Sequence, residues 1–181
     1  MEIKDLKWDQ TSISWLYDNK LITCEVENVI FGNADTQFDY VYVTSGEKFI
    51  ETKFYYFSYT GNELLFFDKL NGIIAWSNGT EKVKKHFKKI IDVKLNSTEK
   101  LTLVLYEDVA NVNKIAGYKV DGNLIFETVV PSSYSVQYLS SVDGIPTIVC
   151  EEENSDEFGR RTWHYLIDVN TGDLKKSNLA Y

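Results

Sequence analysis

The chain has 181 residues, of which 44% are hydrophobic and 25% charged, and this mixed composition excludes a disordered, collagen-like or coiled-coil protein. Its 19 basic and 27 acidic residues give a formal net charge of −8. Because nucleic acid is bound through basic surfaces, we expect no nucleic-acid partner and favour a basic protein partner. No purely apolar run exceeds four residues, whereas a transmembrane helix needs about 20, so we expect no membrane association.

Strand-forming residues dominate the sequence. Val, Ile, Thr, Phe, Tyr and Trp together account for 69 of the 181 residues, while Ala occurs five times and Met once. β-branched and aromatic side chains favour strands, and the residues that usually fill helices are scarce. The composition therefore predicts an all-β protein.

The first 27 residues contain a turn at Asp18-Asn19 before the apolar segment LITCEV, which predicts an N-terminal hairpin over 1–27. Cys24 and Cys150 lie in apolar segments without a metal ligand at a suitable spacing, so we expect two buried free thiols, typical of a reducing compartment. The start of the chain mixes charged and apolar residues, unlike a signal peptide. We therefore expect a cytoplasmic protein whose mature chain begins at Met1.

Three turn signals recur at a fixed distance. Gly72, Gly122 and Gly172 follow Asn71, Asp121 and Thr171, are flanked by apolar segments and lie 50 residues apart. Each predicts a two-residue hairpin turn with a positive φ at the glycine. The spacing divides the chain into units of about 28–77, 78–127 and 128–177 with about four strands each, the first with an added hairpin around Gly61.

A unit of this length with four strands resembles a blade of a β-propeller. The resemblance rests on HFKKIIDVKL followed by LTLVLYE, on KIAGYKVDGNLIF and on WHYLIDVNTGDLKK. It implies a single domain over 1–181 built as a propeller-like array of antiparallel four-stranded sheets. It implies no activity, because the pattern is generic to propellers, and no repeat has the Trp-Asp ending of the common families. A β-sandwich and a meandering barrel of the same strands remain alternatives. Three and a half units leave a ring short unless the chain closes compactly as four blades, forms a dimer of partial propellers, or stays an open curved stack of sheets. In the dimer, a homo-oligomer would form through exposed sheet edges.

One segment departs from the β pattern. Asn78 to Glu81 resembles a helix cap, and Val83, Phe87, Ile90 and Ile91 follow at helical spacing. We predict a short helix through Lys89, with a loop leading into a strand as the alternative.

The residues for common chemistries are few. The chain has only two histidines, His86 and His164, and lacks the nucleophile elbow and the glycine-rich phosphate loop. Asp168 to Asp173 resembles the opening of a calcium loop, but Leu179 stands where the loop needs a glutamate, and a hairpin turn explains these residues. We expect no cofactor and no metal site.

Paired carboxylates remain possible, because glycoside hydrolysis needs only two suitably spaced acids. Asp35 and Asp39, in the segment FGNADTQFDY, are the candidates for such a pair. They define the alternative hypothesis of a hydrolase that acts on carbohydrate or another small polar substrate. Loop aspartates also cap turns, so the pair has a purely structural interpretation as well.

Charge is distributed unevenly. Residues 81–100 contain seven lysines and three acidic residues, whereas all charged residues of the segment 151–157 are acidic. We predict that this second segment contacts a basic partner, through Glu151, Glu152, Glu153, Asp156 and Glu157. Both segments are also explained as solvated loops that prevent edge-to-edge pairing.

The sequence thus favours a non-catalytic protein-binding module. One concrete form is an immunity-type protein that neutralises a basic toxin or nuclease, since bacterial immunity proteins are similar in being small, soluble and acidic. Two other classes remain: the hydrolase with Asp35 and Asp39, and a structural or assembly role through open sheet edges.

Overall fold

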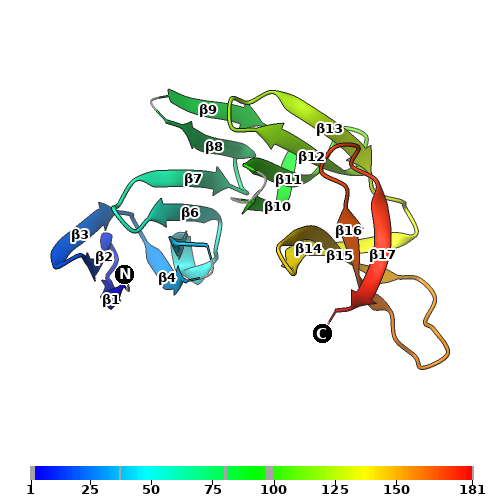
Figure 1. The fold of residues 1–181 in the computed structure, drawn as a ribbon, viewed down its shortest axis with the longest axis horizontal. Helices are drawn as coiled ribbons and strands as arrows, with labels where there is room; N and C mark the ends of the chain where they lie inside the picture. Colours follow the sequence, from blue (N-terminus) through cyan, green and yellow to red (C-terminus); the bar gives the residue numbers. More distant parts are fainter. Residues whose placement is uncertain (1–2, 37, 80, 97–99, 181) are drawn as a thin grey trace. The chain divides into compact units, whose positions relative to one another are not determined.

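The computed structural model describes residues 3–36, 38–79, 81–96 and 100–180, and confirms the all-β prediction (Figure 1). The strands are β1 Lys4–Trp8, β2 Ser12–Tyr17, β3 Lys20–Glu25, β4 Val29–Asp35, β5 Tyr40–Ser45, β6 Lys53–Ser58, β7 Glu63–Asp68, β8 Ile73–Asn78, β9 Glu81–His86, β10 Lys89–Asn96, β11 Leu101–Glu107, β12 Asn113–Lys119, β13 Leu124–Val129, β14 Tyr134–Val142, β15 Ile145–Glu152, β16 Thr162–Ile167 and β17 Leu174–Leu179. Within these ranges the one helical element is the 3₁₀ turn Glu47–Phe49, and no helix is long and apolar enough to cross a membrane.

The strands form four antiparallel sheets in which neighbours follow chain order, β1–β3, β4–β9, β10–β13 and β14–β17. They group into two compact units, Met1–His86 and Phe87–Tyr181. Each unit contains two sheets, and within each unit the first strands of the two sheets lie close together, β1 near β4 and β10 near β14. Each sheet is thus a meander of hairpins.

The first unit has its core between a three-stranded and a six-stranded sheet. Ile13 and Trp15 of β2 are fully buried and belong to the same hydrophobic cluster as Val41 and Val43 of β5. Trp15 also donates its indole N–H to the Tyr59 carbonyl at 2.8 Å, so this buried donor is satisfied.

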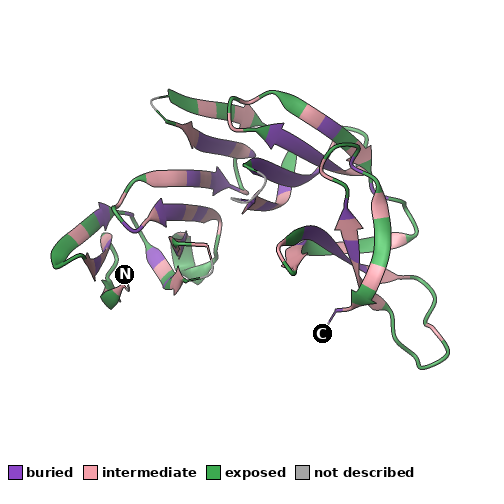
Figure 2. Ribbon diagram, viewed as in Figure 1, coloured by how far each residue is buried: buried purple, intermediate pink, exposed green. Residues whose placement is uncertain are grey.

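The second unit packs two four-stranded sheets face to face, and Figure 2 shows that their most buried strands are β11, β12 and β15. Leu103, Leu105 and Ile115 of the β10–β13 sheet meet Ile148 and Ile167 of the β14–β17 sheet. The buried residues alternate with more exposed ones along strands such as β16, as expected for a sheet with one face in a core.

The helix predicted from Asn78 to Lys89 is wrong in the described residues, and Thr80 lies outside them. Glu81–His86 forms β9, which pairs with β8 and places Val83 opposite Trp76. Pairing with an existing strand satisfies backbone groups and covers the apolar Val83, whereas an isolated short helix on the surface gains little. The sheet that begins in the first predicted repeat unit therefore has six strands, β4–β9, and its last strand, β9, lies beyond residue 77, the predicted end of that unit.

The three turn glycines adopt the positive φ expected of them, at 64° for Gly72, 86° for Gly122 and 79° for Gly172. The turns are longer than the two residues predicted, since Asp68 pairs with Ile73 and Lys119 N–H bonds to Asn123 O. Gly72 also follows the fourth strand of its sheet, whereas Gly122 and Gly172 follow the third. The 50-residue spacing therefore marks similar turns at places in the sheets that are not equivalent.

Candidate functional site

The most exposed large apolar side chains lie at one kind of position in the sheets. Among the described residues, six such side chains have exposed fractions of 64% to 86%, and the next is exposed by 54%. All six lie at, or next to, the connection that follows the second or fourth strand of a sheet, and we call them the apolar tips: Leu21, Phe49, Ile50, Leu70, Val109 and Phe158. In a meander these connections lie at the same end of their sheet, so each sheet presents an apolar tip at that end.

An aspartate fixes three of these connections. The carboxylate of Asp68 accepts hydrogen bonds from Leu70 N and Asn71 N, at 2.9 and 3.0 Å. Asp108 likewise accepts from Ala110 N and Val112 N, at 2.8 and 3.0 Å.

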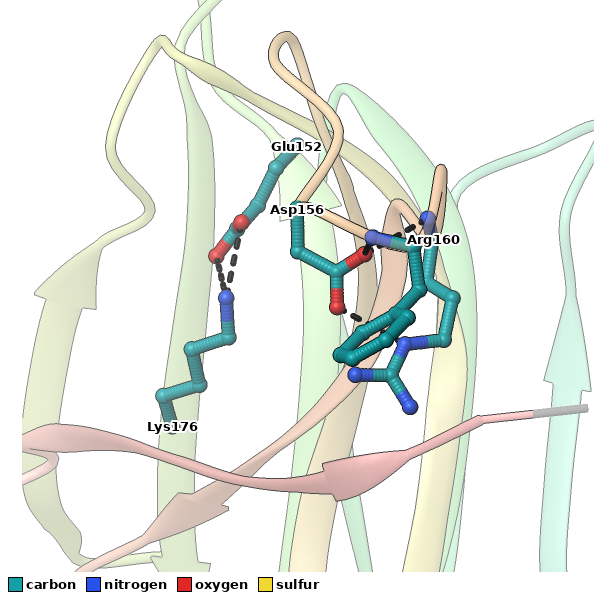
Figure 3. A network of polar contacts seen from close by, with 5 residues as sticks. Glu152, Asp156, Arg160 and Lys176 are labelled. Atoms are coloured by element: carbon teal, nitrogen blue, oxygen red, sulfur yellow. Dashed lines mark hydrogen bonds and ion pairs between the residues drawn. The ribbon is translucent and has the colours of Figure 1, made fainter.

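In the β15–β16 loop, Asp156 accepts from Phe158 N and Arg160 N, both at 2.9 Å. Arg160 Nε adds an ion pair to the other carboxylate oxygen of Asp156 at 2.7 Å (Figure 3). Aspartates therefore hold the backbone next to Leu70, Val109 and Phe158 in one conformation.

The β5–β6 loop is fixed in a different way. Gly46 N donates to Asn28 O at 3.1 Å, and Thr52 N donates to Ser45 O at 3.0 Å. Lys48 and Phe49 have φ values of 53° and 62°, which cost free energy for side chains other than glycine. The loop borders a groove of about 480 Å³ that Ile50 and Leu70 help to line.

The predicted acidic segment divides into engaged and unengaged residues. Lys176 Nζ lies 2.7 and 2.8 Å from the two carboxylate oxygens of Glu152 (Figure 3). Glu152 also accepts a hydrogen bond from the Tyr165 hydroxyl. The hydrogen bond from Lys176, followed by that from Tyr165, holds the pKa of Glu152 below its usual value. Two of the five predicted contact residues, Glu152 and Asp156, are thus held within their own unit.

The other three acids, Glu151, Glu153 and Glu157, make no ion pair with the described residues. Glu151 and Glu153 line an open cavity of about 520 Å³ together with Arg161. Glu157 is exposed next to the apolar tip Phe158. These three carboxylates are the part of the predicted segment that is available to a partner.

The two predicted catalytic aspartates occupy different surroundings. Asp35 accepts a hydrogen bond from Phe38 N at 3.1 Å and lines a pocket of about 210 Å³ with tyrosine side chains. Asp39 is exposed, has a φ of 55° and is not among the described residues that line this pocket. The structure therefore places one carboxylate at a cavity and the other in the turn, and hydrolysis by the pair stays a hypothesis.

Other chemical groups are built into the sheets. Cys24 and Cys150 are buried free thiols, as predicted. His164 Nδ1 lies 3.2 Å from Thr147 Oγ1, and burial lowers the pKa of this histidine. In the described ranges no three His, Cys, Asp or Glu side chains gather where they would hold a metal ion.

Some functional residues were missed by sequence reasoning. Three of the six apolar tips follow a weak local signal, an aspartate one or two residues before the apolar side chain, as in Asp108-Val109 and Asp156-Glu157-Phe158. The Lys176 partner of Glu152 lies 24 residues away in sequence and has no local signal. Comparison with models of known protein families and with curated proteins finds no match, so the geometry alone supports a functional assignment.

Proposed function

We propose that this protein is a non-catalytic protein-binding module that contacts a basic partner protein through its apolar tips and the acidic residues beside them. The observation that carries this proposal is the position of the six most exposed large apolar side chains. All six lie at connections that follow the second or fourth strand of a sheet. Exposed apolar side chains also occur at the other sheet end, as at Leu124 and Ile145, but they are less exposed than any of the six.

The fixed loops favour binding. A side chain on a loop already held by an aspartate loses little further conformational entropy when a partner covers it. Fully burying a side chain such as Phe158 contributes about 1.5–3 kcal/mol. Aromatic side chains in this kind of position are typical binding hot spots.

Charge supports a basic partner. Glu47 and Glu157 are exposed acids within two positions of the apolar tips Phe49 and Phe158, and neither makes an ion pair with the described residues. The net charge of −8 adds a long-range attraction for a cationic surface. An immunity-type protein that neutralises a basic toxin or nuclease is one concrete form of this function, and the buried free thiols fit a reducing cytoplasm.

The same proposal includes a propeller-like architecture. Sheets whose strands follow chain order, with the first strands of successive sheets side by side within each unit, are the arrangement that propeller blades would have. Within each unit of such an array, the connections that carry the apolar tips would lie on one face.

The test is site-specific photo-crosslinking in the cells that produce the protein. A benzophenone side chain at Phe158 or Val109 should crosslink one basic protein, and the 1:1 complex purified at low salt should dissociate as salt is added. Matched controls carry the same group at Ile145 and Leu124, which are exposed apolar residues beside connections at the other sheet end. Equal crosslinking at both sets of positions, or no complex at low salt, would contradict the proposal.

A further inference from the structure

A small aromatic pocket is lined by side chains of β4, β5 and β6, strands of the first unit. Figure 1 labels β4 and β6. Its volume is about 210 Å³, and its described lining consists of Phe31, Asn33, Asp35, Tyr40, Tyr42 and Tyr56. The register explains this composition, because Asn33 pairs with Tyr42, Asp35 with Tyr40, and Tyr42 with Tyr56. Side chains of paired residues point to the same face of a sheet.

The rings meet at steep angles. The ring centre of Tyr56 lies 4.9 Å from that of Tyr40, with an interplanar angle of 68°, and 5.1 Å from that of Tyr42, with an angle of 64°. A sugar ring stacks its flat face on a single aromatic platform. Aromatic walls that stand nearly perpendicular instead surround a compact group on more than one side, as in the cages that bind ammonium groups.

The charge of the pocket favours a cation. Asp35 supplies a carboxylate at the wall, and no basic residue occurs in the described lining. The Asp35 side chain is held in place, since it accepts the Phe38 amide proton at 3.1 Å and hydrogen-bonds to Tyr40. An anionic group fixed beside tyrosine rings attracts a cation both through its charge and through the ring quadrupoles.

The chain already uses this kind of contact elsewhere. Lys69 Nζ lies 4.6 Å from the centre of the Phe54 ring, and Lys176 Nζ lies 4.1 Å from that of Trp163. The size of the pocket also suits an alkylammonium group, because its volume of about 210 Å³ corresponds to roughly seven water molecules of about 30 Å³ each. That volume accommodates the end of a lysine side chain.

We propose that this pocket binds an alkylammonium group, and that its occupant is a lysine side chain of the basic partner. The identity of the occupant rests on the proposed function, whereas binding of an ammonium group by the pocket does not. The pocket can therefore be tested without the partner.

The experiment is an NMR titration of the full chain with Nα-acetyl-lysine methylamide, with the Nε-acetylated compound as the neutral control. We expect shifts confined to the lining residues, and at least about tenfold weaker binding of the neutral compound, equivalent to about 1.4 kcal/mol. Choline is titrated beside its neutral isostere 3,3-dimethylbutan-1-ol. Tighter binding of choline than of the lysine compound would overturn the lysine assignment in favour of a free quaternary ammonium ligand.

Two variant pairs locate the site. Asp35→Asn keeps an oxygen that can accept the Phe38 amide proton, and we expect about fivefold weaker binding of the lysine compound. Asp39→Asn removes the same charge outside the described lining and should leave binding unchanged. Tyr42→Leu should abolish the titration, whereas Tyr138→Leu, on a strand of the second unit, should not affect it.

Equal effects of the two aspartate variants would overturn the proposal. So would binding of the neutral compounds or of methyl glucoside as tight as that of the cations. If the pocket binds the lysine compound but crosslinking finds no partner, the proposed function fails and the ammonium pocket stands. If crosslinking succeeds but the titration shows no shifts, the ammonium pocket fails and the proposed function stands.

Discussion

The ring of Phe126 fills the space that a side chain at Gly117 would occupy. A Cβ atom at Gly117 would lie 2.3 Å from Cε1 of Phe126, its cross-strand neighbour. A Cβ atom at Gly172 would lie 2.5 Å from Cδ2 of the same ring. Two glycines from different sheets thus leave room for one core phenylalanine.

Gly117→Ala is therefore expected to destabilise the protein by about 1–3 kcal/mol, because the added methyl group overpacks the core. Urea unfolding followed by tryptophan fluorescence measures this change. In a Phe126→Leu background the same substitution should lower the free energy of unfolding clearly less, because the smaller leucine leaves room for the added methyl group. An equal cost in both backgrounds would show that the Phe126 ring is not the cause.

Glu152→Gln should lower the free energy of unfolding by about 1 kcal/mol at pH 7, a modest value because Lys176 is partly exposed and solvent screens the pair. The pKa of Glu152 is lowered in the folded state, so the contribution is complete above the ordinary glutamate pKa of about 4.3. It is lost as the pH falls through the lowered value in the folded state. The difference in free energy of unfolding between the variant and the original protein should therefore shrink as the pH falls from 5 to 3.

Glu153→Gln is the matched control, because Glu153 makes no ion pair with the described residues. Its stability at pH 7 should stay within about 0.5 kcal/mol of the original. A comparable loss in both variants would mean that general charge, and not the Lys176 contact, stabilises this region.

The two thiols should be nearly inert in the folded protein. Burial, aided by Glu63, raises the pKa of Cys24 to about 11, and burial, aided by Glu152, raises the pKa of Cys150 to about 12. An unperturbed cysteine has a pKa of about 8.5, so iodoacetamide at pH 8 should label the folded chain at least about 100-fold more slowly than the urea-unfolded chain.

Single Cys→Ser variants assign the labelling to each thiol, and Cys24 should react before the fully buried Cys150. The unfolded chain ionises first as the pH rises above about 8.5, so these thiols also destabilise the fold at alkaline pH. Rapid labelling of Cys150 under native conditions would contradict its burial.

Asp108→Ala should loosen the loop that carries Val109. The amides of Ala110 and Val112 lose their acceptor, and we expect their hydrogen exchange to accelerate by about tenfold. Asp108→Asn keeps an oxygen acceptor and removes the Lys114 ion pair, so exchange there should change little. Faster exchange in both variants would assign the loop order to Lys114.

The all-β fold, the positive-φ glycines and the buried thiols could be predicted because each depends on composition or on adjacent residues. The strand β9 could not, because its stability comes from the pairing of Val83 with Trp76, and the local pattern of lysines and apolar residues equally fits a helix. At the candidate sites, Asp35 was identified from its position beside a strand. Its tyrosine neighbours were not, because the pocket depends on the register of β4, β5 and β6.

Every strand pairs only with its neighbours in the chain, and this has a consequence for synthesis. Contacts of short sequence separation form quickly, since little loop entropy is lost before they are made. The β1–β3 sheet is complete once Glu25 has left the ribosome, and each later sheet can close as its last strand emerges. Each new strand therefore pairs with the strand made just before it, and no sheet has to wait for a segment from far along the chain.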